Sequence, residues 1–317
     1  MAEIAAIGGA VVDVLAQPVS EEVFRTGSYG VDGIRMSAGG DALNEATAIA
    51  RLGRRAMLVT KLGGDAAGDY LRDHCRREGI HTYIAREPGV ATSVNMVLVG
   101  SDGERRFLTA KNTSLRRLSA QDVAPALETA EFAETKIVCL ASMFVSPLLD
   151  VPQMEGLFRK LREKGKLVCA DSTRRKRGET VADVAKALRQ LDYFFPNLEE
   201  AMLLTGEREP DAVADALLEG GVDTVVLKLG RRGCLVRNGS VSFEMSAYPQ
   251  AVCLDTTGAG DCFTAAFMTA LLEERPLREC AAFANGAASV CVEHLGAMPA
   301  AFTREEAEHR AKAILQG

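Results

Sequence analysis

The chain has 317 residues, of which 47% are hydrophobic and 25% charged, and its formal net charge is −6 at pH 7. This composition is typical of a soluble globular protein, and the excess of acid argues against nucleic acid as a partner. No apolar run approaches the ~20 residues that a membrane span needs. No basic segment precedes an apolar one at the N-terminus, so no signal peptide is visible. We expect a cytoplasmic protein that acts without nucleic acid or membrane.

Eight cysteines are spread along the chain, and no two of them form a CxxC pair. A chain of this length and apolar content does not need disulfides, and it offers no zinc-type spacing. We therefore expect buried free thiols. The histidines, four in all, leave little material for a histidine-based catalytic triad.

The first part of the chain alternates between expected strands and helices. These are a strand at 4–7, a helix at 45–52, a strand at 56–62, a helix at 66–78 and a strand at 81–85. Residues 92–99 and 106–109 then predict a hairpin around the turn Ser101-Asp102-Gly103. A hairpin inside such a series does not fit the main sheet. We expect a small second sheet, a lid, formed by about residues 11–36 and 90–110.

The alternation resumes after the lid. Expected helices lie at 120–130, 154–164, 180–191, 198–204, 211–218, 261–273, 277–292 and 303–315, strands at 137–140, 167–171, 193–195 and 224–229, and a second hairpin at 233–237 and 241–245. Repeated βα units with short connections predict an α/β fold with a doubly wound, mostly parallel sheet. One domain over 1–317 is expected, with ligands at the carboxyl ends of the strands.

The most informative stretch is Asp255-Thr256-Thr257-Gly258-Ala259-Gly260-Asp261, just before an apolar helix pattern. Its glycines allow backbone N–H groups to approach a ligand at a helix N-terminus, which favours anions such as phosphate. A lone GxG would be read as a capped turn. The two flanking aspartates do not suit a simple anion trap. A carboxylate here fits phosphoryl transfer, in which it takes a proton from the attacking hydroxyl.

This run resembles the DTxGAGD signature of the PfkB (ribokinase-like) carbohydrate kinases, and the resemblance extends from Ile4 to about Leu295. It implies a ribokinase-like fold with a β lid. It also implies ATP-dependent phosphorylation of a hydroxyl of a small sugar or sugar acid. Asp261 would be the catalytic base, and the N–H groups of Gly258, Ala259 and Gly260 would form the anion hole.

The run Gly39-Gly40-Asp41-Ala42-Leu43-Asn44 departs from the ribokinase pattern GGKGAN. It looks more like the GGDxxN version of 2-keto-3-deoxygluconate kinases and uncharacterised sugar kinases. Asp171 to Arg175 partly matches the family's DxNxR motif, and arginines near that motif and in the lid hold the carboxylate of sugar acids in the family. Arg116 and Arg117 are taken as solvated surface charges. The acceptor contacts that the resemblance implies are Asp13, Gly39, Gly40, Asp41, Asn44, Arg105, Asp171, Arg175 and Asp255.

Asn197-Leu198-Glu199-Glu200 is consistent with a helix cap, and it also resembles the family's NxxE motif. The resemblance implies that Asn197 and Glu200 organise Mg²⁺ through its waters around ATP, which suits the small number of protein ligands that Mg²⁺ often takes. Lys228, Gly230 and Gly233 match a nucleotide-side turn. Asn285 matches an asparagine near the adenine, although a backbone carbonyl would also satisfy its buried amide.

Two further expectations come from the family. A monovalent cation such as K⁺ would lie beside the loop at Asp255–Thr257, and a homodimer could form through the lid. The alternatives to a sugar kinase are a nucleoside kinase and a non-catalytic sugar- or nucleotide-binding regulator. Nucleoside kinases often stack the base on aromatic lid residues, for which the hairpin offers mainly Phe107. The intact Asp261 argues against the regulator, because binding alone needs no base.

Overall fold

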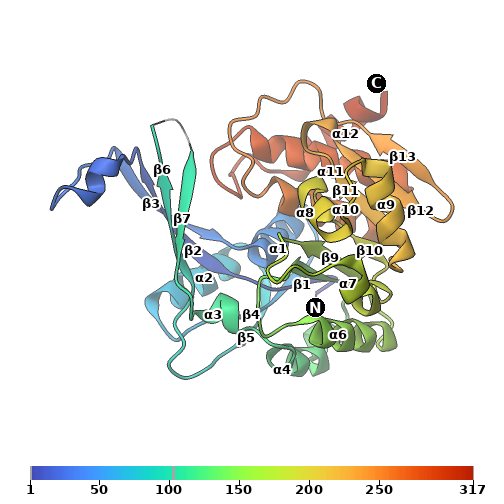
Figure 1. Ribbon diagram of the computed structural model, residues 1–317, viewed down its shortest axis with the longest axis horizontal. Coiled ribbons are helices and arrows are strands. Elements are labelled where there is room, and N and C mark those ends of the chain that lie inside the picture. Colours follow the sequence, from blue (N-terminus) through green and yellow to red (C-terminus); the bar gives the residue numbers. More distant parts are fainter. Residues whose placement is uncertain (1, 102–103, 317) are drawn as a thin grey trace.

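The computed structural model describes residues 2–101 and 104–316, and its body is built on a nine-stranded sheet (Figure 1). The strand order is β13-β12-β11-β10-β9-β8-β1-β4-β5. The parallel strands are β1 (Ile4–Ile7), β4 (Ala56–Lys61), β5 (His81–Ala85), β8 (Ile137–Met143), β9 (Leu167–Ser172), β10 (Tyr193–Phe194) and β11 (Thr224–Lys228). An antiparallel hairpin, β12 (Cys234–Asn238) and β13 (Ser242–Met245), forms one edge.

Helices cover both faces of this sheet, because its side chains alternate between two apolar clusters. In β1, Ile4 and Ala6 belong to one cluster and Ala5 and Ile7 to the other. The first cluster includes α1 (Asp41–Arg51), α2 (Ala66–Arg77), α10 (Ala259–Leu272), α11 (Leu277–Val292) and α12 (Arg304–Gln316). The second includes α4 (Ala120–Val123), α6 (Val151–Glu163), α7 (Val181–Leu188), α8 (Leu198–Thr205) and α9 (Pro210–Glu219). The predicted doubly wound α/β fold is confirmed.

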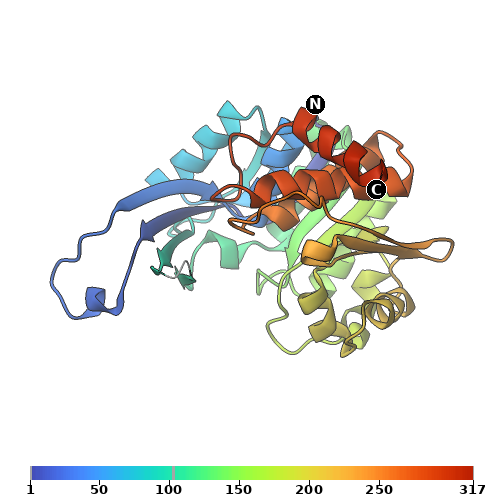
Figure 2. The ribbon, with the colours of Figure 1, turned by 90° about the horizontal axis from the view of Figure 1, so that it is seen from above.

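The lid is a separate four-stranded sheet in the order β3-β2-β6-β7. Its strands are β2 (Val11–Gln17), β3 (Gly33–Gly39), β6 (Val94–Val99) and β7 (Arg105–Thr109). Figure 2 shows it projecting from the body, with the short helix η1 (Glu21–Phe24) near its far end. The register pairs Asp13 with both Ser37 and Asn95. These three side chains share one face of the lid, because successive side chains on a strand point to opposite faces. Asp102 and Gly103 of the predicted turn lie outside the described residues.

The largest differences between predicted and observed helices occur at two places. The helix expected at 120–130 is wrong: the segment forms α4, the 3₁₀ helix η2 (Ala124–Glu128) and α5 (Ala130–Ala133). Pro125 has no N–H to donate, and Thr129 is extended and caps the next helix through Phe132 N. The helix expected from residue 45 begins at Asp41 instead, because Gly40 adopts a φ of 96° as its N-cap.

The cysteines follow the expectation with one exception. Seven are buried and free, whereas Cys253 is free but exposed. The apolar run at 251–254 that suggested its burial forms no strand and lies in an exposed connection to the signature loop. No helix in the described part of the chain is both long enough and apolar enough to cross a membrane.

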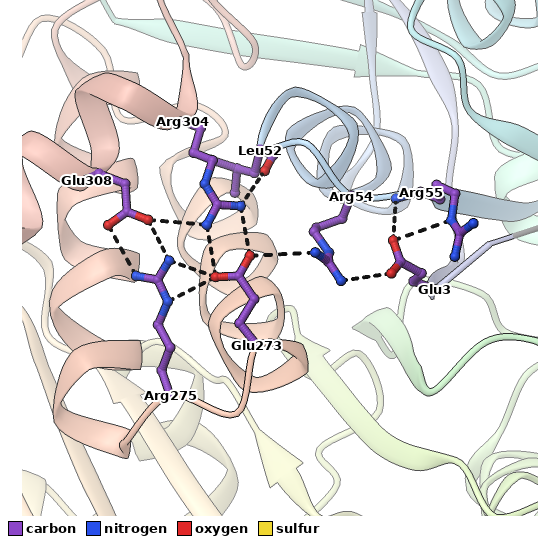
Figure 3. Close-up of polar contacts among 8 residues, drawn as sticks. All are labelled: Glu3, Leu52, Arg54, Arg55, Glu273, Arg275, Arg304 and Glu308. Carbon is purple, nitrogen blue, oxygen red and sulfur yellow. Dashed lines mark hydrogen bonds and ion pairs between the residues drawn. The ribbon is translucent and has the colours of Figure 1, made fainter.

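A charged network fixes the C-terminal end of α10 against its neighbours (Figure 3). Glu273 accepts hydrogen bonds from Arg275 at 2.7 Å and from Arg304 at 2.8 and 2.9 Å, and Arg304 also donates to Leu52 O. Arg54 lies 3.9 Å from Glu273 and 2.8 Å from Glu3, at the start of the chain. The network therefore ties α10 to the end of α1, to α12 and to the segment before β1.

Candidate active site

The signature loop ends at the N-terminus of α10, where Gly258 is the N-cap with a φ of 77°. A side chain at Gly258 would clash with Ala297, since a Cβ there would lie 2.5 Å from Ala297 O. The N–H of Ala259 donates to Thr256 O at 3.2 Å, whereas those of Gly258 and Gly260 have no backbone acceptor in the described chain outside the helix itself. Two of the three predicted anion-hole donors are therefore free at a helix N-terminus, where the dipole favours negative charge.

Asp261 lies in the first turn of α10, and its Oδ2 accepts a hydrogen bond of 2.7 Å from Asn44 Nδ2 on α1. Burial raises the pKa of Asp261 well above its ordinary value, and the negative charge of Asp41 raises it further. The hydrogen bond from Asn44 opposes this shift. Once ionised, a carboxylate with a raised pKa is a more effective proton acceptor than an ordinary aspartate.

Two more carboxylates lie on the acceptor side of Asp261. Asp13 Oδ1 accepts from Asn95 Nδ2 at 2.9 Å, and a Cβ at Gly39 would lie only 2.3 Å from Asp13 Oδ2. Burial raises the pKa of Asp13. Asp41 is the first residue of α1, and burial together with Asp171 raises its pKa to about 6. These groups can accept hydrogen bonds from hydroxyls, with Gly39 providing the space beside them.

A buried ion pair lies beneath the glycines of the loop. Lys228 Nζ, at the end of β11, lies 2.5 Å from Asp171 Oδ2 at the end of β9. The same oxygen accepts from Thr264 Oγ1 at 3.0 Å, and Ser172 N donates to Asp171 Oδ1 at 2.6 Å. A Cβ at Gly260 would lie 3.4 Å from Lys228 Nζ. Lys228 thus adds positive charge beside the glycines of the loop, while Asp171 is fully engaged within the protein.

Asn197 and Glu200 form a capping box at the start of α8. Asn197 Oδ1 accepts from Glu200 N at 2.9 Å, and Glu200 Oε2 accepts from Asn197 N at 3.3 Å. Ser172 Oγ donates to the same Glu200 oxygen at 3.0 Å. Glu200 Oε1 has no protein hydrogen bond within the described ranges, so it is available to a metal-bound water. Burial raises the pKa of Glu200.

The lid and the signature loop meet directly. Arg105, on β7, lies 2.5 Å from Asp255 Oδ2 and donates to Thr257 Oγ1 at 2.5 Å. Gly296 N also donates to Asp255, at 2.7 Å. Although burial alone would raise the pKa of Asp255, the hydrogen bonds that it accepts lower it, so it is ionised opposite Arg105. A cleft of about 700 Å³ lies at this junction, lined by lid residues such as Val99 and by the loop at Asp255–Thr257.

Other predicted residues lie outside this constellation or are engaged elsewhere. Arg175 donates to Gly178 O at 3.2 Å and to Glu179 O at 2.6 Å in its own loop. Asn285 donates to Met245 O at 3.1 Å, which is the backbone-carbonyl alternative considered above. Gly230 and Gly233 form the turn η3 (Gly230–Arg232) between β11 and β12. That turn packs against β13, because a Cβ at Gly233 would lie 2.0 Å from Met245 O.

Three residues of the site were not anticipated. Thr264 lies one helical turn after Asp261, so its spacing could have indicated that both face Asp171. Asn95 is opposite Asp13 in the lid register, a pairing between strands that are far apart in the sequence. Glu45 follows Asn44 and is fully buried. Neither of its oxygens has a hydrogen bond of normal geometry in the part of the chain described. Burial raises the pKa of Glu45 well above its usual value, although the thiol of Cys139 lies close enough to oppose this shift.

Comparison with known proteins agrees with this geometry. The family model described as pfkB family carbohydrate kinase matches residues 1–304. The ribokinase of Haemophilus influenzae is 29% identical over 86% of each chain, and the 2-dehydro-3-deoxygluconokinase of Bacillus subtilis is 25% identical over 93% of this chain and 94% of its own. The structure of Arabidopsis thaliana ribokinase complexed with ribose and ATP superposes with a TM-score of 0.79 at 25% identity, covering 98% of this chain and 99% of that one.

The fold and the loop thus define a carbohydrate kinase, which is a phosphotransferase with an alcohol group as acceptor. The chain belongs to the pfkB family of carbohydrate kinases, and its fold is ribokinase-like.

Proposed function

We propose that the protein uses ATP and Mg²⁺ to phosphorylate a hydroxyl of a small sugar or sugar acid, with Asp261 as the general base. The observation that carries this proposal is the position of Asp261. It is a buried carboxylate at the N-terminus of α10, hydrogen-bonded to Asn44, beside the free N–H groups of Gly258 and Gly260. Those N–H groups would stabilise the charge on the transferring phosphoryl group, while Asp261 takes the hydroxyl proton.

On the acceptor side, Asp13, Gly39, Gly40, Asp41 and Asn44 would orient the substrate. Asp13 and Asp41 can each accept hydrogen bonds from hydroxyls, and Asn44 also holds the base. Asp171 would contribute indirectly: its ion pair would hold Lys228 in position, and Asp171 itself would not contact the acceptor. Arg105 and Asp255 would close the lid over the loop, which excludes the water that could otherwise hydrolyse ATP.

On the nucleotide side, Lys228 would contact the phosphates, and the turn containing Gly230 and Gly233 would line the nucleotide. Asn285 would help to shape the adenine side. The residues present fit Mg²⁺, because Glu200 keeps one oxygen free of protein partners and Mg²⁺ is often held through its own waters. Bound there, Mg²⁺ would neutralise charge on the phosphates, while Asn197 and Glu200 would hold its water shell.

We also propose a monovalent cation beside the loop at Asp255–Thr257. Thr257 O and Ala297 O each lie 3.3 Å from Cys291 Sγ, so two carbonyl oxygens converge behind the loop. Carbonyl oxygens suit hard cations. Activity measured in K⁺ against a bulky organic cation at equal ionic strength tests this. The eight free cysteines favour a reducing compartment such as the cytoplasm.

A homodimer through the outer face of the lid is proposed from the strand register. Met36, Val14, Met96 and Leu108 pair with one another in a single row across all four strands, on the face opposite Asp13. Met36, Met96 and Leu108 are each about half exposed, which is unusual for a contiguous apolar row. Sedimentation of wild type and Met96→Lys should give a dimer and a monomer. A monomeric wild type contradicts the proposal.

A nucleoside kinase is the alternative within the family. Phe107 shares the inner face of the lid with Asn95, two residues along the register, and it is 56% exposed, so a base could stack on it. ADP release with aldoses, ketoses, sugar acids and nucleosides as acceptors distinguishes these functions. A nucleoside preference supports the alternative, and no acceptor-dependent ADP with any of them contradicts the proposed kinase.

A further inference from the structure

The segment between α11 and α12 packs against the back of the signature loop. Its residues 293–300 form neither a helix nor a strand. Gly296 N donates to Asp255 Oδ2 at 2.7 Å. Ala297 packs against Gly258, because a Cβ on that glycine would lie 2.5 Å from Ala297 O. The N-cap of α10, and with it the free N–H group of Gly258, is therefore supported by this segment.

An arginine from outside the segment holds two of its carbonyls. Arg51 Nη1 donates to Pro299 O at 2.9 Å and to Met298 O at 3.3 Å. Its Nε and Nη2 donate to the carboxylate of Glu78, the C-cap of α2, at 2.9 and 2.6 Å. A planar guanidinium that is bound along one edge by a carboxylate has a fixed direction for its remaining N–H groups. Arg51 therefore connects α2 to the segment in one defined geometry.

Arg51 also shares a face of α1 with the residue that holds the proposed base. Asn44 and Arg51 are seven residues apart, which is two helical turns or about 10 Å along the axis. Asn44 Nδ2 donates to Asp261 Oδ2 at 2.7 Å near the start of α1. Arg51 is the last residue of α1 and contacts the segment that supports Gly258. One helix therefore orients both the base and the support of the N-cap.

The alternative is that Arg51 only stabilises the ends of two helices. A cation at the C-terminal end of a helix is favourable in itself, and an ion pair with Glu78 adds to this. However, neither Met298 nor Pro299 belongs to α1 or α2. The bonds to their carbonyls do not stabilise those helix ends. They fix a segment that has no regular structure of its own.

We propose that Arg51 is a positioning residue for phosphoryl transfer: it holds the carbonyls of Met298 and Pro299 and so keeps the N-cap of α10 in place. This inference rests on the proposed kinase function. Arg51 would act through the segment and not by contact with a substrate. Because the N–H group of Gly258 would bind charge that develops in the transition state, its displacement should lower kcat more than it raises either KM.

The kinetic test compares Arg51→Met with Arg54→Met at saturating ATP and acceptor. Methionine keeps an apolar side chain but cannot donate to the segment. Since a misplacement of about 1 Å can cost about 100-fold, kcat of Arg51→Met should fall by about 10- to 100-fold, with little change in either KM. Arg54→Met is the matched control, because the two arginines are 23% and 26% exposed. The partners of Arg54, which are Glu3 and Glu273, do not belong to the segment (Figure 3).

Thiol alkylation provides a readout that needs no activity. The buried Sγ atoms of Cys291 and Cys262 lie 3.3 and 4.0 Å from Ala297 O, so the segment packs against both thiols. With N-ethylmaleimide and detection by mass spectrometry, these two cysteines should react faster in Arg51→Met than in wild type. Cys139 is the internal reference, because it is buried in β8 of the main sheet and becomes accessible only when the protein opens more widely.

Each outcome decides for or against the inference. A fall in kcat in Arg51→Met alone, with faster labelling of Cys262 and Cys291 but not of Cys139, supports it. An unchanged kcat, an equal fall in Arg54→Met, or equally increased labelling of Cys139 contradicts it. If wild type forms no ADP with any acceptor, the proposed kinase function fails. Selective labelling then still supports the positioning of the segment by Arg51, and uniform labelling contradicts it.

Discussion

The guanidinium of Arg105, on the lid, lies 2.5 Å from the carboxylate of Asp255, in the loop that leads to the catalytic helix. The two residues are 150 positions apart in the sequence: Arg105 belongs to the small sheet of the lid, whereas Asp255 lies in the loop between β13 and α10. Asp255 is also held by Gly296 N and Thr257 N, so the pair links the lid to an ordered loop. This ion pair therefore links the position of the small sheet to the shape of the loop before α10, where we propose the anion hole.

Replacing Arg105 should uncouple ATP use from acceptor phosphorylation. In Arg105→Met the lid loses its direct bond to the loop, so we expect a higher KM for the acceptor. Water also enters the site more easily, so ATP hydrolysis without acceptor should rise. Arg106→Met is the matched control, since this neighbour is exposed and its bond to Glu104 lies within the lid. If the ratio of phosphorylated product to ADP is the same in both variants, the ion pair between Arg105 and Asp255 does not couple lid closure to phosphorylation.

Asn44 should set the pH dependence of the reaction. Its hydrogen bond to Asp261 lowers the pKa of that carboxyl against the effect of burial. In Asn44→Leu the pKa of Asp261 rises further, so the base stays protonated up to a higher pH. The acid limb of kcat/KM should therefore move to higher pH, and activity should recover in part as the pH increases. Superimposable pH profiles for variant and wild type would remove Asn44 from this role.

Lys228 should be a stability determinant as well as a phosphate ligand. Its side chain and that of Asp171 are 13% and 7% exposed, so Lys228→Met leaves a buried carboxylate without its cation. Loss of one partner of such a pair typically costs about 3–5 kcal/mol. Urea unfolding should report a loss of this size, and Lys228→Met/Asp171→Asn should recover part of it. If the double variant is as unstable as Lys228→Met, the unpaired carboxylate of Asp171 is not the cause of the lost stability.

Replacing Glu200 should weaken Mg²⁺ binding more than it weakens acceptor binding. Glu200→Gln keeps the capping geometry but removes the charge beside the proposed water shell. The Mg²⁺ concentration for half-maximal rate should increase, with little change in acceptor KM. Glu199→Gln is the control, because Glu199 is exposed on the same helical turn. If the Mg²⁺ titrations of Glu200→Gln and wild type coincide, the motif serves only as a helix cap.

Much of the fold could be predicted because its signals are local. A few neighbouring residues are enough to recognise buried runs such as 4–7 and 56–62 and the signature loop. The strand β1 and the helix α11 have the predicted bounds. The continuous helix expected at 120–130 does not form, because Pro125 removes a helical donor. The helix expected from residue 45 begins at Asp41, because the positive φ of Gly40 makes that glycine the N-cap.

The pairings among the proposed site residues could not be predicted from the sequence. The family resemblance indicated Asp261 and Asn44 separately, but their hydrogen bond depends on the packing of α1 against α10. The partners of Arg105 and Asp171 likewise come from elements far away in the chain.

The most direct test of the account is the turnover of Asp261→Asn. The substitution keeps the shape and the neighbouring groups but removes the proton acceptor, and general base catalysis contributes about 10²–10⁴-fold. Phosphorylated acceptor should be formed by wild type in an amount equal to the ADP released, and at least a hundredfold more slowly by the variant, with ATP binding retained. A variant that keeps more than about a tenth of wild-type turnover, with the chemical step rate-limiting, would contradict the assignment.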